Sequence, residues 1–79
     1  MDELSWRARL AKSNINILGI DGNRWYYEFM YHPRPGQTKW CKTYFDVPIS
    51  SECATDSDND CNARVLQEEV LNLRKELEG

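Results

Sequence analysis

Residues 24–47 read RWYYEFMYHPRPGQTKWCKTYFDV. All of the chain's aromatic residues except Trp6 lie in this stretch. Two runs, 25–32 and 38–47, carry the aromatic and β-branched side chains that strands prefer. Between them, the prolines and glycine of 33–36 interrupt the ladder and allow the chain to reverse. The stretch therefore predicts two antiparallel strands that supply most of the core.

A further strand is expected just before this hairpin, at residues 14–20. Ile15 and Ile17 alternate there with asparagines, which is the period of a half-buried strand. The following Asp-Gly-Asn at 21–23 is typical of a tight hairpin turn. Three consecutive strands joined in this way form a meander.

The C-terminal residues 60–79 predict an amphipathic helix. Leucine and valine recur there at helical spacing, at Leu66, Val70, Leu73 and Leu77. Two (i, i+4) ion pairs are expected, Arg64–Glu68 and Arg74–Glu78, and Asp58 or Asp60 is expected to cap the first turn. The apolar stripe requires a partner surface, and the sheet is the nearest one.

The sequence thus predicts one α+β domain over residues 1–79. It comprises a short N-terminal helix (1–13), a three-stranded antiparallel meander (14–47), an acidic loop (48–59) and a helix (60–79) that packs on the sheet. Packing on the sheet is favoured over a coiled coil because the stripe spans under two heptads. Homodimerisation through this helix stays open.

Charge fixes which face of the hairpin meets the helix. Pairing His32 with Trp40 puts Lys42 on the face that holds Glu28, and it leaves the other face apolar. A slip of one residue would exchange the two faces and bury the ammonium group of Lys42, which is costly. The helix is therefore expected to cover the face that carries Trp25, Tyr27, Phe29, Tyr31, Cys41, Thr43, Phe45 and Val47.

The opposite face is the candidate binding surface. It combines basic and aromatic side chains. Cations pair with phosphates, and aromatic rings pack against sugars and bases, so the combination predicts a nucleic-acid interface that binds duplex DNA. The expected contact residues are Arg24, Tyr26, Arg34, Lys39, Trp40, Lys42 and Tyr44. A simpler alternative is that these side chains only cover the sheet, or that the N-terminal helix packs there through Trp6 and Leu10.

The order of elements resembles a family of DNA-binding domains. An aromatic strand at 25–29, the strand segment 40–46 and a following amphipathic helix resemble the three-stranded domains of tyrosine integrases and plant AP2 factors. The N-terminal arm-binding domains of conjugative-transposon integrases are the most similar in pattern, over about residues 14–78. The resemblance implies that the sheet lies in a major groove, with contacts from Arg24, Tyr26, Trp40, Lys42 and Tyr44.

A different class of function is also consistent with the sequence. The net charge is −3, and residues 51–79 are the acidic part of the chain. A small acidic chain of this kind is typical of phage or mobile-element adaptors and inhibitors that bind a protein, for example a nucleic-acid-handling enzyme. The expected contacts for this alternative are Trp40, Asp56, Asp58, Asp60, Glu68 and Glu69.

Other chemistries have little support in the sequence. No nucleophile motif, phosphate loop or cofactor motif is visible, so we expect no catalysis and no cofactor. The aspartates of 56–60 lack the glycine and glutamate that a calcium loop needs, and His32, Cys41, Cys53 and Cys61 lack zinc-site spacing. Three cysteines and no apolar span favour an intracellular protein, cytoplasmic or nuclear, that does not enter a membrane.

Overall fold

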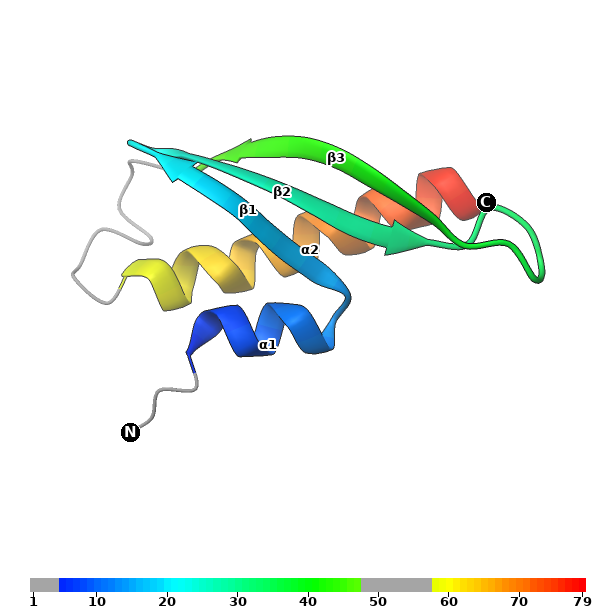
Figure 1. Ribbon diagram of the computed structural model, residues 1–79, viewed down its shortest axis with the longest axis horizontal. Helices are drawn as coiled ribbons and strands as arrows, with labels where there is room; N and C mark the ends of the chain where they lie inside the picture. The colour runs from blue at the N-terminus through cyan, green and yellow to red at the C-terminus, as the bar shows by residue number, and fades with distance from the viewer. Residues whose placement is uncertain (1–4, 48–57) are drawn as a thin grey trace.

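The computed structural model describes residues 5–47 and 58–79. Their elements are, in order, α1 (Trp6–Lys12), β1 (Ile15–Asp21), β2 (Arg24–Tyr31), β3 (Lys39–Asp46) and α2 (Asp58–Glu78). The three strands form an antiparallel sheet in the order β1-β2-β3, and both helices lie against one face of it (Figure 1). The predicted α+β architecture is confirmed. Residues 1–4 of the predicted N-terminal helix and 48–57 of the predicted loop lie outside the described residues.

The core lies between the sheet and the two helices. β2 contributes the largest buried side chains, Trp25, Tyr27 and Phe29, because alternate residues of a strand point to the same face. Trp6 of α1 stacks on Trp25 with ring centroids 4.7 Å apart. The remaining buried apolar residues are Leu10, Ile15, Phe45, Ala63, Leu66 and Val70.

The face assignment of the hairpin is as predicted, but its register is not. Trp40 lies opposite Met30 instead of His32, so β3 is shifted by two residues relative to the expected pairing. A shift of two keeps every side chain on its own face, because the strand period is two. The shift changes which side chains meet across the strands, and it places Lys42 directly opposite Glu28.

The N-terminal helix α1 packs on the same face of the sheet as α2, and this face is called the inner face. The alternative in which Trp6 and Leu10 pack on the outer face is therefore wrong. Leu10 is fully buried in the same core cluster as Leu66 and Val70 of α2, and Trp6 stacks on Trp25 on the helix side of the sheet. Because both helices lie on one side, no described element covers the opposite face (Figure 1).

The predicted details of α2 need three corrections. The helix begins at Asp58, so Asp60 lies within the first turn instead of capping it, and there it pairs with Arg9 and Arg64. The buried stripe ends at Leu73, and Leu77 is 42% exposed. Glu78 accepts a hydrogen bond from the backbone N–H of His32 instead of pairing with Arg74.

Arg74 of α2 forms hydrogen bonds with the backbone where α1 ends and β1 begins. Its guanidinium donates to the carbonyl oxygens of Met30 (2.9 Å), Ser13 (2.7 Å) and Asn14 (3.5 Å). Asn14 adopts a left-handed conformation with φ 61°, which asparagine tolerates better than most residues. One α2 side chain thus bonds the end of α1, the start of β1 and the end of β2.

A bulge interrupts β1. Ile17 lies opposite Tyr27 and Gly19 lies opposite Tyr26, which leaves Leu18 as an extra residue without a cross-strand partner. Such a bulge bends and twists a strand locally. Leu18 is 54% exposed as a result.

We expect Leu66→Ala to lower the free energy of unfolding by about 2–5 kcal/mol, because it removes a fully buried side chain and leaves a cavity. Leu71→Ala is the matched control, since Leu71 lies on the same helix and is 53% exposed; its effect is expected to stay within about 0.5 kcal/mol. Urea unfolding followed by tryptophan fluorescence measures both. Equal effects of the two substitutions would contradict the packing described here.

The hydroxyl of Tyr27 is buried without a hydrogen-bond partner. Burial raises the pKa of Tyr27 from 10.0 to about 12, and the nearby negative charge of Glu69 adds to this. The neutral form is therefore the stable one in the folded chain. Its contribution to stability is complete below pH 10 and is lost as the pH rises from 10 toward 12.

We expect Tyr27→Phe to leave the free energy of unfolding at neutral pH unchanged or to raise it by about 1 kcal/mol, since it removes an unsatisfied polar group. The variant should also lose less stability than the parent above pH 10. Denaturant titrations across this pH range provide the measurement, with Tyr26→Phe on the exposed face as the control. A clear loss of stability at neutral pH would show that the hydroxyl has a bonding role.

Candidate functional site

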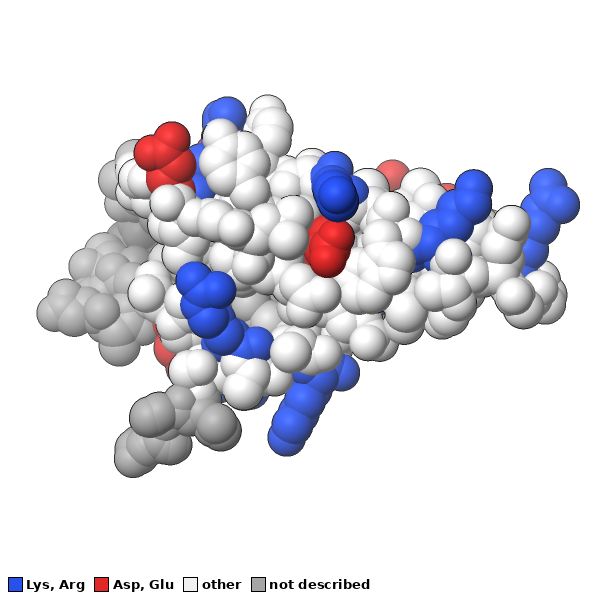
Figure 2. All heavy atoms as spheres, viewed as in Figure 1, with Lys and Arg blue, Asp and Glu red and all other residues white. Residues whose placement is uncertain are grey.

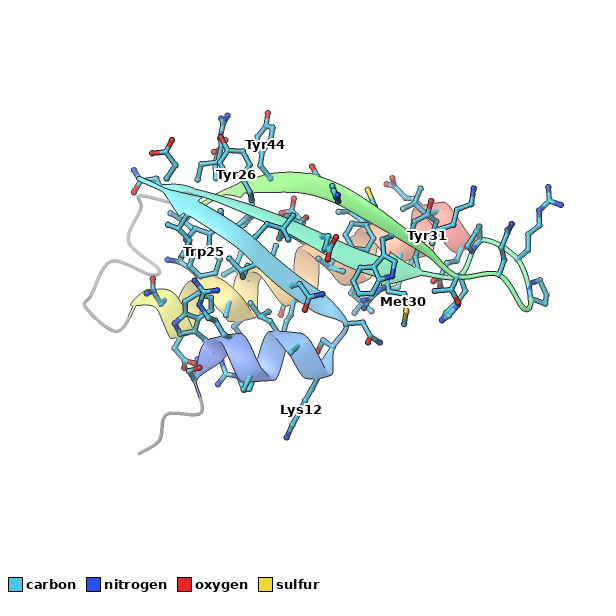
Figure 3. All side chains as sticks on the ribbon, viewed as in Figure 1. Lys12, Trp25, Tyr26, Met30, Tyr31 and Tyr44 are labelled. Atoms are coloured by element: carbon cyan, nitrogen blue, oxygen red, sulfur yellow. The ribbon has the colours of Figure 1, made fainter. Side chains whose placement is uncertain are left out.

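The surface opposite the helices, here called the outer face, is built from alternate residues of the three strands. Figure 3 shows Tyr26 and Tyr44 on this side of the sheet and Trp25 on the helix side. The cross-strand pairing assigns the following strand residues to the outer face: Asn16, Gly19, Asp21, Arg24, Tyr26, Glu28, Met30, Trp40, Lys42, Tyr44 and Asp46. The face is thus continuous across all three strands.

Three large aromatic side chains are exposed on the outer face. Tyr26, Trp40 and Tyr44 are 41%, 46% and 49% exposed. Tyr26 and Tyr44 lie opposite each other and meet edge to face, with ring centroids 6.4 Å apart. Trp40 lies near the other end of the sheet, opposite Met30. Two apolar patches therefore occupy the two ends of the face.

Polar residues form a row between these patches. Asn16, Glu28 and Lys42 lie side by side on successive strands. The amide of Asn16 donates to a carboxylate oxygen of Glu28 at 3.4 Å. Because Glu28 is directly opposite Lys42, their opposite charges offset each other in the middle of the face.

Arg24 is engaged by its own neighbours. Its guanidinium donates to both carboxylate oxygens of Asp46, at 2.6 and 3.1 Å, and lies 4.0 Å from the centre of the Tyr44 ring. These hydrogen bonds hold the pKa of Asp46 below its ordinary value and raise the pKa of Arg24 further. A phosphate that approached Arg24 would have to compete with an aspartate already in bidentate contact.

The outer face is not basic. Its strand residues include two cations, Arg24 and Lys42, and three anions, Asp21, Glu28 and Asp46. Figure 2 shows Lys and Arg side chains as separate groups on the visible surface, with acidic side chains among them. The sequence identified the aromatic residues and Lys42 as neighbours, but it missed Asp21 and Asp46. The alternation of β3 already places Asp46 on the face of Lys42, whereas its contact with Arg24 depends on the register.

Two of the predicted nucleic-acid contacts lie away from the outer face. Lys39 lies opposite Tyr31 at the start of β3, and the alternation of the strand places it on the helix side. Arg34 lies in the exposed connection between β2 and β3. The structure brings together Arg24, Tyr26, Trp40, Lys42 and Tyr44.

The residues predicted for a protein partner are also divided. Glu68 and Glu69 are exposed on α2, whereas Asp60 is part-buried in its pairs with Arg9 and Arg64. Asp56 lies outside the described residues, as does the side chain of Asp58. Trp40 is on the outer face, across the sheet from the helices. The sequence analysis missed the exposed Leu18 and Ile20 of β1, because it assigned the two faces from the β2–β3 hairpin alone.

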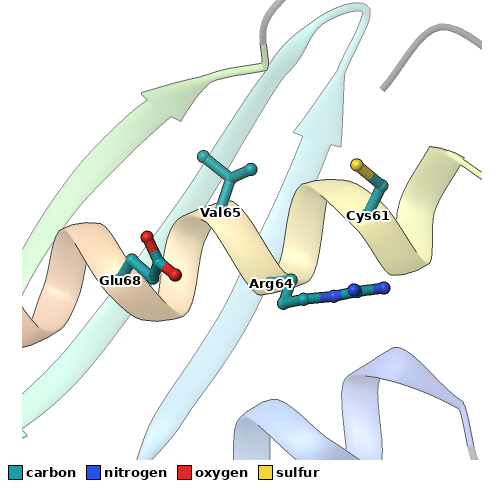
Figure 4. A pocket seen from close by; sticks show the side chains of 4 residues that line it. All are labelled: Cys61, Arg64, Val65 and Glu68. Atoms are coloured by element: carbon teal, nitrogen blue, oxygen red, sulfur yellow. The ribbon is translucent and has the colours of Figure 1, made fainter. Parts of the chain in front are cut away.

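Other candidate sites on the described residues are weak. An open pocket on α2 is lined by Cys61, Arg64, Val65 and Glu68, all from one helix (Figure 4). Cys61 is disulfide-bonded, whereas Cys41 is a free thiol. In the part of the chain that the structure describes, no cluster of three or more His, Cys, Asp or Glu could hold a metal ion. Within that part, neither helix is long and apolar enough to cross a membrane.

The ring of His32 contacts residues of the connection between β2 and β3. Its ring Nδ1 lies 3.2 Å from the carbonyl oxygen of Gln37 and 3.3 Å from the hydroxyl of Thr38. Both partners belong to the same β2–β3 connection. The contacts of the ring therefore stabilise this connection.

Comparison with known proteins adds no relative. No protein-family model, no curated protein and no solved structure matches the chain. The resemblance to integrase and AP2 domains stays a prediction from the sequence pattern.

We expect Arg24→Gln to raise the pKa of Asp46 toward its ordinary value, because the substitution removes the guanidinium that holds the carboxylate. Any stability that the pair supplies is present above the ordinary pKa of Asp46 and is lost as the pH falls through the lowered value. Carboxyl carbon NMR shifts followed against pH measure the change. Lys42→Gln is the control, because Lys42 lies opposite Glu28 and should leave Asp46 unaffected.

Proposed function

We propose that this chain is a non-catalytic binding module that recognises a protein partner through the outer face of its sheet. The observation that carries the proposal is the exposure of Tyr26, Trp40 and Tyr44 on a face that no described helix covers. Tryptophan and tyrosine supply much of the binding energy in protein interfaces. They are held here by a packed sheet, so little conformational entropy is lost when they bind.

The charge of the outer face favours a protein over duplex DNA. A domain that binds DNA without help from a partner needs free cations to neutralise phosphates. On this face Arg24 is already held by Asp46, and Lys42 lies opposite Glu28. Mixed charges around aromatic patches are instead typical of the polar surroundings of a protein interface.

Duplex DNA is the competing proposal. Arg34 and Lys39 are exposed in or beside the β2–β3 connection and could supply phosphate contacts together with Lys42. The DNA proposal requires binding that weakens steeply with salt. Measurement with a labelled mixed-sequence duplex at low and physiological salt therefore separates the two.

The test of the protein-binding proposal uses a displayed library of random peptides selected on the immobilised chain. We expect an enriched pool whose retention falls by about tenfold or more on Trp40→Ala, since truncation of an interface tryptophan removes a large contact. Leu71→Ala, an equally exposed apolar residue on α2, should retain the pool fully.

Two outcomes would contradict the proposal. The first is equal retention of the pool by Trp40→Ala and by the parent chain. The second is salt-dependent binding of the duplex that is weakened by Lys42→Gln but not by Trp40→Ala, which would favour DNA.

A further inference from the structure

β3 is an edge strand with a long regular border. Among the described residues it pairs only with β2, over eight consecutive residues without a bulge. The unpaired border of such a strand presents a row of backbone donors and acceptors that can template another strand. This border is therefore a candidate site for strand addition.

The hydrogen-bond phase shows which residues of β3 face this border. The N–H of Val47 donates to the carbonyl of Asn23 at 2.8 Å, and the N–H of Met30 donates to the carbonyl of Asn14 at 3.1 Å. Hydrogen-bonded residues alternate along an antiparallel ladder, so odd-numbered residues of β3 bond to β2. The backbone N–H and C=O groups that point to the free border belong to Trp40, Lys42, Tyr44 and Asp46.

These are the same residues whose side chains form the β3 part of the outer face. A strand that added to the border would accept backbone hydrogen bonds from Trp40, Lys42 and Tyr44 and would also lie beside their side chains. Backbone bonds would give affinity, and the aromatic side chains would select apolar neighbours on that face.

The opposite border of the sheet is less suitable. In β1 the residues that face away from β2 are Ile15 and Ile17 before the bulge and Ile20 after it. The bulge at Leu18 breaks the two-residue spacing that an added strand needs. β3 therefore offers the regular edge.

The flank of α2 that faces away from α1 is acidic. Asp60, Gln67 and Arg74 face α1, through contacts with Arg9 and Ser13. Glu69 lies about 200° around the helix from Gln67, and Glu76 is one heptad further along the same flank. Because α1 packs beside β1, both glutamates lie on the flank of α2 that faces away from α1 and β1.

We propose that β3 binds an extended basic segment of a protein partner, which adds to the sheet as a fourth strand. The added strand would direct alternate apolar side chains toward Trp40 and Tyr44 and basic side chains toward Glu69 and Glu76. This inference rests on the proposed function and specifies its partner. Such a strand would contact both the aromatic outer face and the acidic helix flank, which lie on opposite sides of the sheet.

A second copy of the chain is a poorer occupant of the edge. A two-fold pairing centred on Lys42 would place two ammonium groups opposite each other. Pairing centred on Thr43 avoids this, but both arrangements bring together two copies of the Glu69 and Glu76 flank. Each chain also carries a net charge of −3. In the proposed segment, apolar side chains lie beside Lys42 and basic side chains lie beside the glutamates, so both repulsions are avoided.

The first experiment uses a synthetic peptide of alternating valine and lysine as the probe, with an alternating valine and glutamate peptide as the control. We expect only the lysine peptide to bind. Amide exchange should then slow by about tenfold or more at Trp40, Lys42, Tyr44 and Asp46, with little change at the odd-numbered residues already bonded to β2. N-methylation of alternate amides of the same peptide should abolish binding.

Lys42→Pro is the decisive variant, with Lys42→Gln as its matched control. Proline removes an N–H that points to the free border and not to β2, so the fold is expected to persist, as urea unfolding can verify. Both variants lose the charge of Lys42, but only Lys42→Pro should weaken the binding of the lysine peptide, by about tenfold or more. The double substitution Glu69→Gln and Glu76→Gln should weaken the binding of the same peptide about fivefold.

The outcomes separate this inference from the proposed function. Equal binding by Lys42→Pro and Lys42→Gln would overturn strand addition, and so would equal binding of the glutamate peptide or association of the chain with itself in place of peptide binding. None of these would affect the result with Trp40→Ala and the displayed library. Failure of that result would instead reject the outer face as the interface.

Discussion

The alternation of side chains along β2 is the constraint on which the molecule depends. Trp25, Tyr27 and Phe29 must all be buried, since they supply the largest share of the core in a chain of this size. Burying them directs every intervening residue of β2 to the other side. The aromatic surface exposed to solvent is therefore a consequence of how the core is filled, and β3 follows the same alternation through its pairing with β2.

Arg74 gives this arrangement its second fixed point. A sheet and two helices joined only by apolar packing could slide against each other, because apolar contact is not directional. The guanidinium of Arg74 donates to the backbone carbonyls of Ser13, Asn14 and Met30, and planar donors of this kind set orientation as well as distance. The bond from Gln67 to the hydroxyl of Ser13 adds to the same corner. The helices are thereby held on the inner side, and the outer face stays uncovered by the described elements.

Much of the fold could be predicted from the sequence because its signals are periodic. The strands, the C-terminal helix and the division of the hairpin into two faces all follow from spacing and from the cost of burying Lys42. The register could not be fixed in the same way, because a shift of two residues leaves both faces unchanged and only alters cross-strand neighbours. The contacts within the candidate site were the part of the structure that the undetermined register left open. The contacts of Arg24 with Asp46, and the position of Lys42 opposite Glu28, exist only in the observed pairing.

The bulge of β1 has a consequence for stoichiometry. A sheet with two regular borders can grow in both directions, and a chain of such units can polymerise into a filament. Here Leu18 disrupts one border, while the other stays regular. Strand addition is therefore favoured on one side of this sheet, and units that add at one border alone form finite assemblies instead of filaments.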